Sequence, residues 1–208
     1  KSLNLSGYIY ENASVRRFSF EFGGRINYDR ITPETEDRSA DIGHIREREF
    51  LTYSLSFSAL YELTNKVYVG ANVSKSSRVP TIEELFSEGP HLAAYSYEIG
   101  NPNLESESGI GAELFVYHNF EKLNLNVNVF RNDISYYITP RNTGEKNYAT
   151  FLPIYKSFGV PAVFYGAEGK IDWEFVKKIN LSTTMSYAYG EFSDSQNPLP
   201  QIPPLKGN

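Results

Sequence analysis

Side chains able to bind a metal or to form ion pairs gather between residues 74 and 105. His91 follows a Gly-Pro pair in a predicted loop, where an imidazole suits either iron or zinc. His44 and His118 stand apart, without the i,i+4 pairing of a zinc site. His91 is therefore the candidate metal ligand, and the alternative is a loop histidine with no ligand role.

Arg78 stands near the start of this segment, and carboxylates that could pair with it follow at Glu84, Glu105 and Glu107. An Arg withdrawn from water needs such a partner. Structural roles are expected for Arg78, Pro80, Glu84, Asn101, Pro102, Asn103 and Glu107. The spacing does not support a catalytic carboxylate pair, and the sequence contains no nucleophile elbow, P-loop or calcium loop. We therefore predict that the protein is not an enzyme.

Aromatic and cationic side chains are interspersed between residues 131 and 160. Stacking and charge attraction from such side chains would hold an anionic, partly apolar ferric chelate. The alternative is that the rings pack loop against loop. The candidate ligand-binding residues are His91, Tyr136, Tyr137, Arg141, Tyr148 and Tyr155.

Alternation of polar and apolar residues runs through the rest of the chain and predicts about eight β-strands. In residues 50–62 the odd positions from Leu51 to Tyr61 are apolar, and most even positions are Ser or Thr. Residues 123–129 alternate Leu or Val with Asn. Leu51, Leu55, Phe57, Val127, Trp173 and Leu181 are expected to face lipid, with Ser54, Asn126 and Thr184 on the opposite face.

The lengths of the connections alternate as well. Short turns are predicted near residues 11–14, 63–65, 118–121 and 176–178, and long loops near residues 29–48, 74–105 and 131–160. Each long loop lies between two short turns, so all long loops leave the sheet at the same end. Short periplasmic turns and long extracellular loops are typical of an outer-membrane barrel. The predicted fold is an all-β, antiparallel transmembrane β-barrel.

Composition agrees with this fold without requiring it. Hydrophobic residues make up 40% of the 208 residues, and no run approaches the ~20 apolar residues of a membrane helix. A tyrosine-rich soluble β protein would fit the composition alone. The absence of cysteine excludes disulfides and thiolate chemistry, and the net charge of −5 argues against nucleic acid as a partner.

Several spaced motifs resemble signatures of TonB-dependent outer-membrane receptors. An Arg-x-Pro…Glu-Leu-Phe box occupies residues 78–86, and an Asn-Pro-Asn-Leu…Glu box occupies residues 101–107. The likeness continues in order through Phe-Arg-Asn-Asp-Ile at 130–134, Gly-Ala-Glu at 166–168 and Leu-Pro-x-Ile-Pro-Pro at 199–204. The resemblance therefore covers most of the chain.

The resemblance implies an active transporter, in which a barrel of about 22 strands holds a plug that the TonB complex pulls on. Residues 1–208 would be a fragment of about eight strands, without the plug and without a signal peptide or starting Met. The implied function is import of an iron–siderophore or another metal complex. The implied partners are that chelate, outer-membrane lipid and lipopolysaccharide, and the TonB complex acting through the missing plug, with no cofactor.

Alternatives remain at the level of function. Haem receptors of this family keep a His between the two boxes, and Gly-Pro-His also resembles a zinc-uptake branch, so His91 would serve haem or zinc. A passive porin or surface-binding barrel would explain the alternation but not the boxes. An outer-membrane enzyme would need a catalytic set that the sequence does not show.

Overall fold

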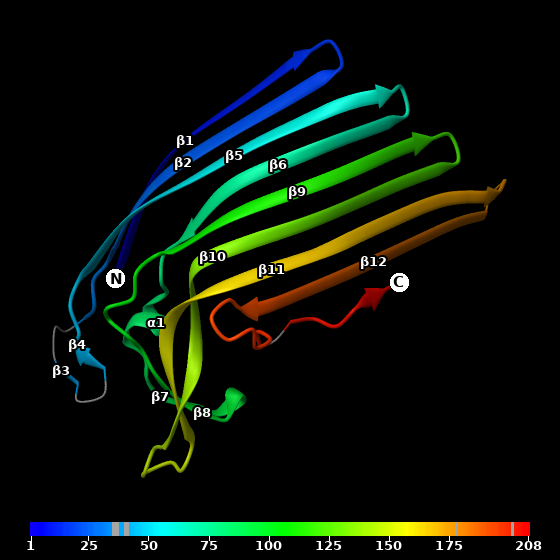
Figure 1. The fold of residues 1–208 in the computed structure, drawn as a ribbon. Helices are drawn as coiled ribbons and strands as arrows, with labels where there is room; N and C mark the ends of the chain where they lie inside the picture. Colours follow the sequence, from blue (N-terminus) through cyan, green and yellow to red (C-terminus); the bar gives the residue numbers. More distant parts are fainter. Residues whose placement is uncertain (35–37, 40–41, 178, 201) are drawn as a thin grey trace.

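The computed structural model describes residues 1–34, 38–39, 42–177, 179–200 and 202–208. Its long strands form one curved antiparallel sheet in which neighbours along the chain are neighbours in space (Figure 1). The long strands are β1 (Ser2–Val15), β2 (Phe18–Ile31), β5 (Arg48–Thr64), β6 (Val67–Arg78), β9 (Glu107–Phe120), β10 (Leu123–Lys146), β11 (Pro153–Val176) and β12 (Ile179–Phe192). The prediction of about eight strands is confirmed.

The sheet is open in this chain. Among the described residues, β1 forms one edge. At the other edge, the side of β12 that faces away from β11 is bordered by the short β13 (Lys206–Gly207) and by a bridge from Glu191 to Pro198. The tight turns lie together at one end of the sheet and the longer connections lie at the other, which we call the loop end (Figure 1). The loop end carries β3 (Arg38–Ser39), β4 (Gly43–His44), α1 (Ile82–Phe86), β7 (Glu88–His91), η1 (Leu92–Ala94) and β8 (Ser96–Ile99).

Two predicted boundaries are wrong. The first turn falls at Arg16, which has a positive φ of 56°, and not at residues 11–14, because the polar residues there continue the alternation of β1. Residues 131–160 are not an irregular loop, since β10 and β11 stay paired as far as Lys146 and Pro153. A register shift between Ile134 and Tyr137 interrupts the period-2 pattern there, which hid the continuing strands.

The other predicted connections agree more closely with the structure. The predicted loop 74–105 begins a few residues too early, because β6 continues to Arg78. The predicted loop 29–48 also begins early, because β2 continues to Ile31. Within the predicted loop 29–48, residues 35–37 and 40–41 lie outside the described part of the chain. Lys178 of the predicted fourth turn and Gln201 of the Leu-Pro-x-Ile-Pro-Pro motif also lie outside it.

The strand register assigns the alternating residues to two faces. Directly opposed residues of an antiparallel pair point to the same side, so Leu55, Lys75, Ile110 and Asp133 share one face through successive pairs. The large apolar residues predicted to face lipid lie on this side and are exposed, with Leu51 at 71%. We call this side the outer face. A broad exposed apolar face is expected where the surrounding solvent is lipid.

The opposite, inner face is polar. Neighbouring strands are joined across it by a hydrogen bond of 2.6 Å from the Asn72 amide to the Ser58 hydroxyl. A second bond of 2.8 Å runs from the Asn128 amide to the Glu113 carboxylate. Side chains of this kind suit a hydrated interior.

Aromatic residues bound the apolar band at both ends. Near the turns, Phe18 packs on Tyr61 with ring centroids 4.6 Å apart, and Trp173 packs on Phe175 at 4.9 Å. Near the loop end, Tyr165 and Tyr189 pack at 5.4 Å. Rings at two levels are typical of the two interfaces of a membrane. Residues on the loop side of the Tyr165–Tyr189 pair lie outside the membrane-spanning segments.

Within the described part of the chain, no helix has the length and apolar character needed to span a membrane.

The main hydrophobic cluster of described residues lies at the loop end and not within the single-layered sheet. Leu85 and Leu104 are fully buried there, and they pack with Ile31, Phe50 and Ile138. In a globular domain, apolar side chains pack between layers of secondary structure. Here they pack between the connections and the strand ends, and so hold the connections together.

The two-faced sheet predicts different costs for a charge at adjacent positions. In the complete barrel protein that contains these strands, Val127→Arg places a charge on the outer face and should cost about 2–4 kcal/mol of folding free energy. Asn126→Arg, one residue away on the inner face, should cost much less. Denaturant unfolding in lipid vesicles measures both, and equal costs would contradict a lipid-facing wall.

Candidate ligand-binding platform at the loop end

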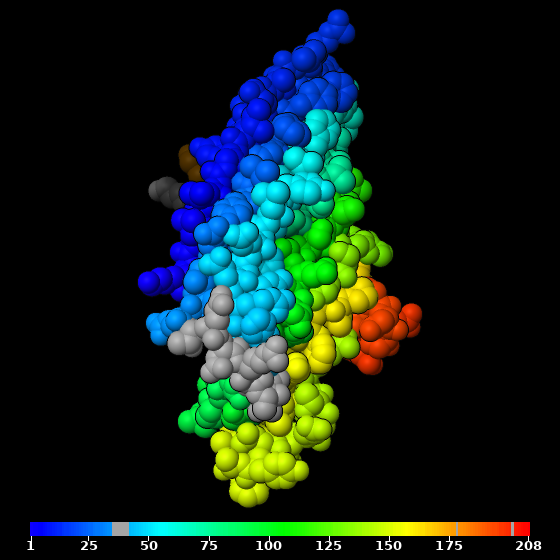
Figure 2. All heavy atoms as spheres, turned by 90° about the vertical axis from the view of Figure 1, so that its left-hand side faces the viewer, coloured from blue at the N-terminus to red at the C-terminus, as the bar shows by residue number. Residues whose placement is uncertain are grey.

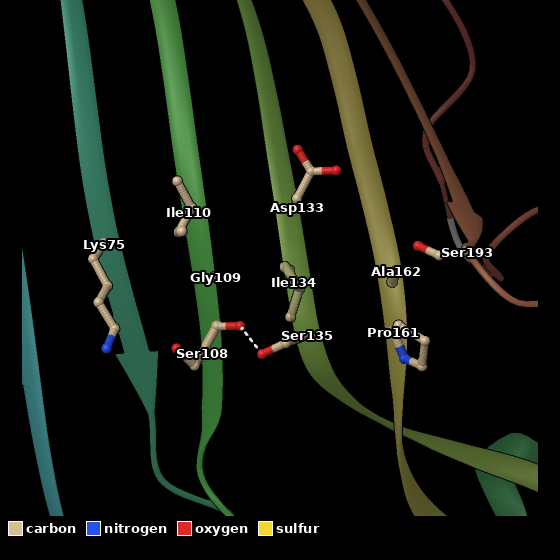
Figure 3. A pocket seen from close by; sticks show the side chains of 10 residues that line it. All are labelled: Lys75, Ser108, Gly109, Ile110, Asp133, Ile134, Ser135, Pro161, Ala162 and Ser193. Atoms are coloured by element: carbon tan, nitrogen blue, oxygen red, sulfur yellow. Dashed lines mark hydrogen bonds between the residues drawn. The ribbon is translucent and has the colours of Figure 1, made fainter.

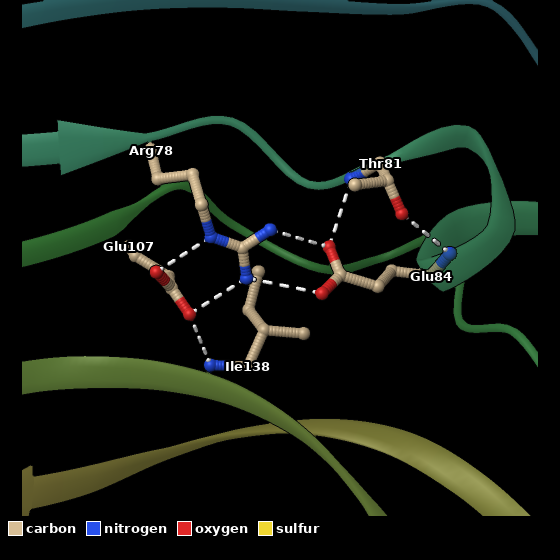
Figure 4. Close-up of polar contacts among 5 residues, drawn as sticks. All are labelled: Arg78, Thr81, Glu84, Glu107 and Ile138. Carbon is tan, nitrogen blue, oxygen red and sulfur yellow. Dashed lines mark hydrogen bonds and ion pairs between the residues drawn. The ribbon is translucent and has the colours of Figure 1, made fainter.

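Arg78, the last residue of β6, joins three elements through two carboxylates (Figure 4). Its guanidinium donates to both oxygens of Glu107 at 2.7 Å and to both oxygens of Glu84 at 2.9 and 3.0 Å. Glu107 begins β9 and Glu84 belongs to α1. Hydrogen bonds to Glu107, and then to Glu84, raise the pKa of Arg78 above its ordinary value. The paired arrangement fixes the direction of each side chain as well as its charge.

Helix α1 has only one turn and depends on its surroundings. Thr81 and Glu84 form a capping box, in which each side chain accepts from the other residue's backbone N–H at 3.1 and 2.8 Å. Glu84 thus caps the helix with the carboxylate that also binds Arg78. Gly100 passes so close to α1 that an added Cβ would lie 2.6 Å from the backbone of Leu85 and Phe86. Only glycine allows this approach.

Glu107 also reaches the third connection. Its Oε1 atom accepts a hydrogen bond of 2.7 Å from the backbone N–H of Ile138 in β10 (Figure 4). Ile138 follows the register shift between Ile134 and Tyr137. One carboxylate therefore links the Arg78 cluster to the strand that carries Tyr136, Tyr137 and Arg141, three of the candidate ligand-binding residues.

The first connection is attached to the second through arginines. Arg48 at the start of β5 donates to the carbonyl oxygens of Pro102 and Leu104, the latter at 2.9 Å. Arg46 donates to the Asn103 side chain at 3.0 Å. Burial lowers the pKa of Arg48 from its ordinary value, and each of its two terminal nitrogens donates to one of these carbonyls.

The Asn-Pro-Asn turn that Arg48 contacts is stabilised by a hydrogen bond within the turn. The Asn101 side-chain oxygen accepts from the Asn103 backbone N–H at 3.0 Å, and Pro102 is fully buried. This local bond is the reason that Asn suits the first position of the turn.

The second and third connections share a sheet. Strand β8 pairs in parallel with β11, placing Tyr97, Glu98 and Ile99 opposite Ile154, Tyr155 and Lys156. The Asn101 amide donates to the Ser157 carbonyl at 3.3 Å. We call residues 78–107 together with 136–157 the loop platform. Figure 2 shows the β10–β11 tip in yellow-green at the lower end of the molecule, with green residues of the second connection beside it.

His91, the candidate metal ligand, ends β7 at the rim of the platform. Its Nδ1 lies 2.7 Å from a carboxylate oxygen of Glu98, and its side chain is 55% exposed. Because the carboxylate occupies Nδ1, Nε2 is the ring nitrogen that remains for an outside ligand. Among the described residues, no three His, Cys, Asp or Glu side chains lie close enough to hold a metal ion by themselves.

The other candidate ligand-binding residues differ in accessibility. Tyr148, at the tip between β10 and β11, is 96% exposed. Tyr136 packs on the loop-end core, and its hydroxyl accepts from the backbone N–H of Glu105 at 3.3 Å. Tyr155 is half-buried opposite Glu98. The platform therefore presents Tyr148 outward and uses Tyr136 for packing.

Tyr137 and Arg141 contact side chains of the neighbouring strands β11 and β12. Tyr137 meets Phe164 edge to face at 5.5 Å, and burial raises the pKa of its hydroxyl. The Arg141 guanidinium lies over the Phe192 ring at 4.6 Å, with Asp194 at 3.9 Å. These contacts hold Arg141 against the end of β12 while leaving it half-exposed.

Sequence reasoning did not identify Arg48 as a residue of the site. The available signal was its position two residues before Phe50 in the alternation of β5, which directs both side chains to the inner face and into the core. Glu105, expected as a third partner for Arg78, is not in the ion-pair cluster of the described residues and contributes its backbone N–H to Tyr136 instead.

Removing Arg78 should loosen the platform. Arg78→Met leaves the two carboxylates facing each other, at a cost of about 1–2 kcal/mol once partial solvent screening is allowed for. Amide hydrogen exchange over residues 81–107 should become roughly tenfold faster. The matched control is Arg30→Met, because Arg30 pairs with Glu49 at 2.7 Å on a strand that is already paired. Equal effects of the two variants would show that the cluster has no special role.

Comparison with known proteins places this geometry in a family. The family model described as TonB dependent receptor-like, beta-barrel matches residues 3–208. Iron-regulated outer membrane virulence proteins from two strains of Vibrio cholerae serotype O1 are 25% identical over an alignment of 209 positions that covers 95% of this chain. The chain spans 29% of the length of these curated relatives.

Solved structures show the same fold. The copper transporter OprC superposes with a TM-score of 0.80 at 18% identity, covering 98% of this chain and 30% of that protein. The ferric yersiniabactin uptake receptor FyuA from Yersinia pestis gives 0.69 at 15% identity, covering 99% and 30%. Since the family model covers nearly the whole chain, the chain belongs to the TonB-dependent receptor β-barrel family of outer-membrane transport receptors, which are not enzymes.

Proposed function

We propose that this chain is the platform-bearing part of a receptor that captures a scarce metal complex at the outer surface and imports it with energy from TonB. The observation that carries the proposal is the joining of the second and third connections into the loop platform by Arg78 and Glu107, with the first connection attached to it through Arg48. A pre-organised surface loses less conformational entropy when it binds a ligand than separate mobile loops do.

The chemistry of the platform supports a metal chelate as the ligand class. Tyr148 offers an exposed ring, and Arg141 supplies a cation held by Phe192. Aromatic faces with a nearby cation attract an anionic, partly apolar ligand. The similar proteins named above are described as a copper transporter, a ferric yersiniabactin uptake receptor and an iron-regulated outer membrane virulence protein, and a metal complex is the substrate class that we propose here.

A second candidate function is favoured by one contact. The Glu98 carboxylate on Nδ1 of His91 resembles the outer-shell carboxylate that orients metal-binding histidines. With Nε2 directed outward, His91 would provide one axial ligand to haem or one ligand to zinc, and the cargo would supply or recruit the others.

Partners on the inner side follow from the polar face. Glu113, bonded to Asn128, and the exposed Glu168 border a cavity of about 280 Å³ on this face. We propose that a plug with complementary basic groups occupies this side and that TonB acts through it. The loop end then faces the exterior, with extracellular connections at residues 32–47 and 79–106 and at the tip of the β10–β11 hairpin, residues 147–152.

Uptake by the complete receptor separates the two cargo classes. His91→Ala should abolish haem or zinc uptake if His91 is a metal ligand, and should leave uptake of a ferric chelate nearly unchanged. His44→Ala is the matched control, since His44 is an exposed histidine in the first connection. Unchanged haem and zinc uptake in His91→Ala would eliminate the second candidate function.

Tyr148 tests the chelate surface directly. Tyr148→Ala should weaken binding of a ferric chelate by about three- to tenfold, the range expected for loss of one stacking ring. Tyr187→Ala, on the outer face of β12 away from the platform, serves as the control. Chelate titrations monitored by fluorescence quenching give both affinities, and equal affinities for wild type and Tyr148→Ala would remove Tyr148 from the site.

A further inference from the structure

Two cations lie directly opposite each other on the β10–β11 hairpin, between the sheet and the tip. Arg141 on β10 is paired in the register with Lys156 on β11, so both side chains leave the same face of the hairpin. Like charges at directly opposed positions repel each other and destabilise a strand pair. Such a pair needs either a counter-charge within the protein or an anion that binds between the two side chains.

The described part of the protein supplies little counter-charge. Arg141 faces Asp194, but the 3.9 Å between the guanidinium nitrogen and the carboxylate oxygen is too long for a hydrogen bond. Lys156 is half-buried, and no carboxylate among the described residues lies within ion-pair distance of its ammonium group. Glu88 shares this face but is two strands away, because it is opposite Ile99, which is opposite Lys156.

The Arg141 guanidinium is held in place while its donors stay available. It lies 4.6 Å from the centroid of the Phe192 ring, a contact that positions the group without using its N–H donors. Within the residues that the structure describes, the Arg141 side chain donates no hydrogen bond. A planar guanidinium with free donors suits a carboxylate, because it binds both carboxylate oxygens at once.

The base of the hairpin is anchored to the sheet. Figure 3 shows Ser135 of β10 and Pro161 of β11 where the two strands leave the sheet, with Ser193 nearby. The Ser193 backbone N–H donates to the Pro161 carbonyl at 3.0 Å, and the Ser135 hydroxyl donates to the Ser108 carbonyl at 2.9 Å. Asp194 follows Ser193 and is held by the same anchor, so the cation pair and its weak counter-charge have fixed positions.

An aromatic side chain borders the pair. Phe158 is two residues along β11 from Lys156 on the same face, and it is 40% exposed. Two cations beside an exposed ring suit an organic anion better than a strongly hydrated inorganic one, because the ring packs on the apolar part of the ligand.

We propose that Arg141 and Lys156 together bind a carboxylate group of the imported chelate, one that is not coordinated to the metal. The inference rests on the proposed function and narrows its substrate class to chelates that carry free carboxylates. The Arg141 guanidinium binds both oxygens of the carboxylate, and the Lys156 ammonium pairs with one of them. Lys156 is then a specificity-determining residue, and the cargo removes the repulsion across the strand pair.

Amide hydrogen exchange on the complete, ligand-free receptor tests the pair itself. Lys156→Gln should slow exchange at residues 139–143 and 154–158, because it removes the repulsion between the opposed cations. The matched control is Lys146→Gln, since Lys146 is an exposed lysine of the same hairpin, opposite Pro153. It should leave exchange unchanged. Unchanged or faster exchange in Lys156→Gln would show that the lysine has only a structural role and would overturn the inference.

Binding of two ferric complexes, measured by fluorescence quenching, tests the carboxylate. One is the iron–citrate complex, whose chelator carries free carboxylates, and the other is a neutral trihydroxamate complex. Lys156→Gln should weaken binding of the citrate complex about fivefold, the effect of losing one partly exposed ion pair, and should leave the hydroxamate complex unaffected. Asp194→Asn should tighten binding of the citrate complex, because Asp194 competes for Arg141. Millimolar inorganic phosphate should not displace the citrate complex.

The outcomes separate this inference from the proposed function. Unchanged citrate affinity in Lys156→Gln, an equal loss for both complexes, an equal loss in Lys146→Gln, or displacement by phosphate would overturn the inference and leave the proposed function standing. A wild-type receptor that binds no ferric complex would contradict the proposed function and the inference together. Heat-modifiable gel mobility verifies the folding of each variant.

Discussion

The paired ion bridges of Arg78 are the constraint on which the loop end depends. One guanidinium binds the carboxylate that caps α1 and the carboxylate that begins β9. The second carboxylate continues to the backbone of β10. Each of these groups would be costly to leave partly buried without its partner. The shared arginine therefore couples the positions of three elements that the sheet alone would leave independent.

The sheet explains why such coupling is needed. A single layer with lipid on one face and a polar interior on the other has no hydrophobic interior of its own. Leu85 and Leu104 gain full burial only where the connections fold over the strand ends and meet Phe50. Apolar packing supplies the driving force for closing the connections, and the arginine contacts determine their relative positions. A binding surface built this way can be rigid although it lies on segments between strands.

Much of this architecture is predictable because it follows from local rules. The period-2 alternation specifies faces, and the alternation of short and long connections places the loops at one end, so the barrel wall follows from the sequence. The extension of β10 and β11 was not predictable, because one extra residue in β10 at the Ile134–Tyr137 register shift breaks the alternation while the backbone pairing resumes beyond it.

The site was predictable to a smaller extent. The partners Glu84 and Glu107 follow from the need of Arg78 for counter-charge, whereas the contact of Arg48 with the Pro102 and Leu104 carbonyls joins residues far apart in the chain. The exposure of Tyr148 and the burial of Tyr136 also depend on tertiary packing, since both are tyrosines in one aromatic-rich segment.

The central claim is that the second and third connections form one rigid body. The sequence contains no cysteine, so spin labels attached to cysteines introduced at Leu92 and Tyr148 would report without background. Both positions are exposed, and they lie on connections joined by the β8–β11 pairing. Pulsed electron–electron double resonance on the complete receptor in lipid should give a single narrow distribution of distances between the two labels in the absence of ligand. A broad or multiple distribution would contradict a pre-organised platform.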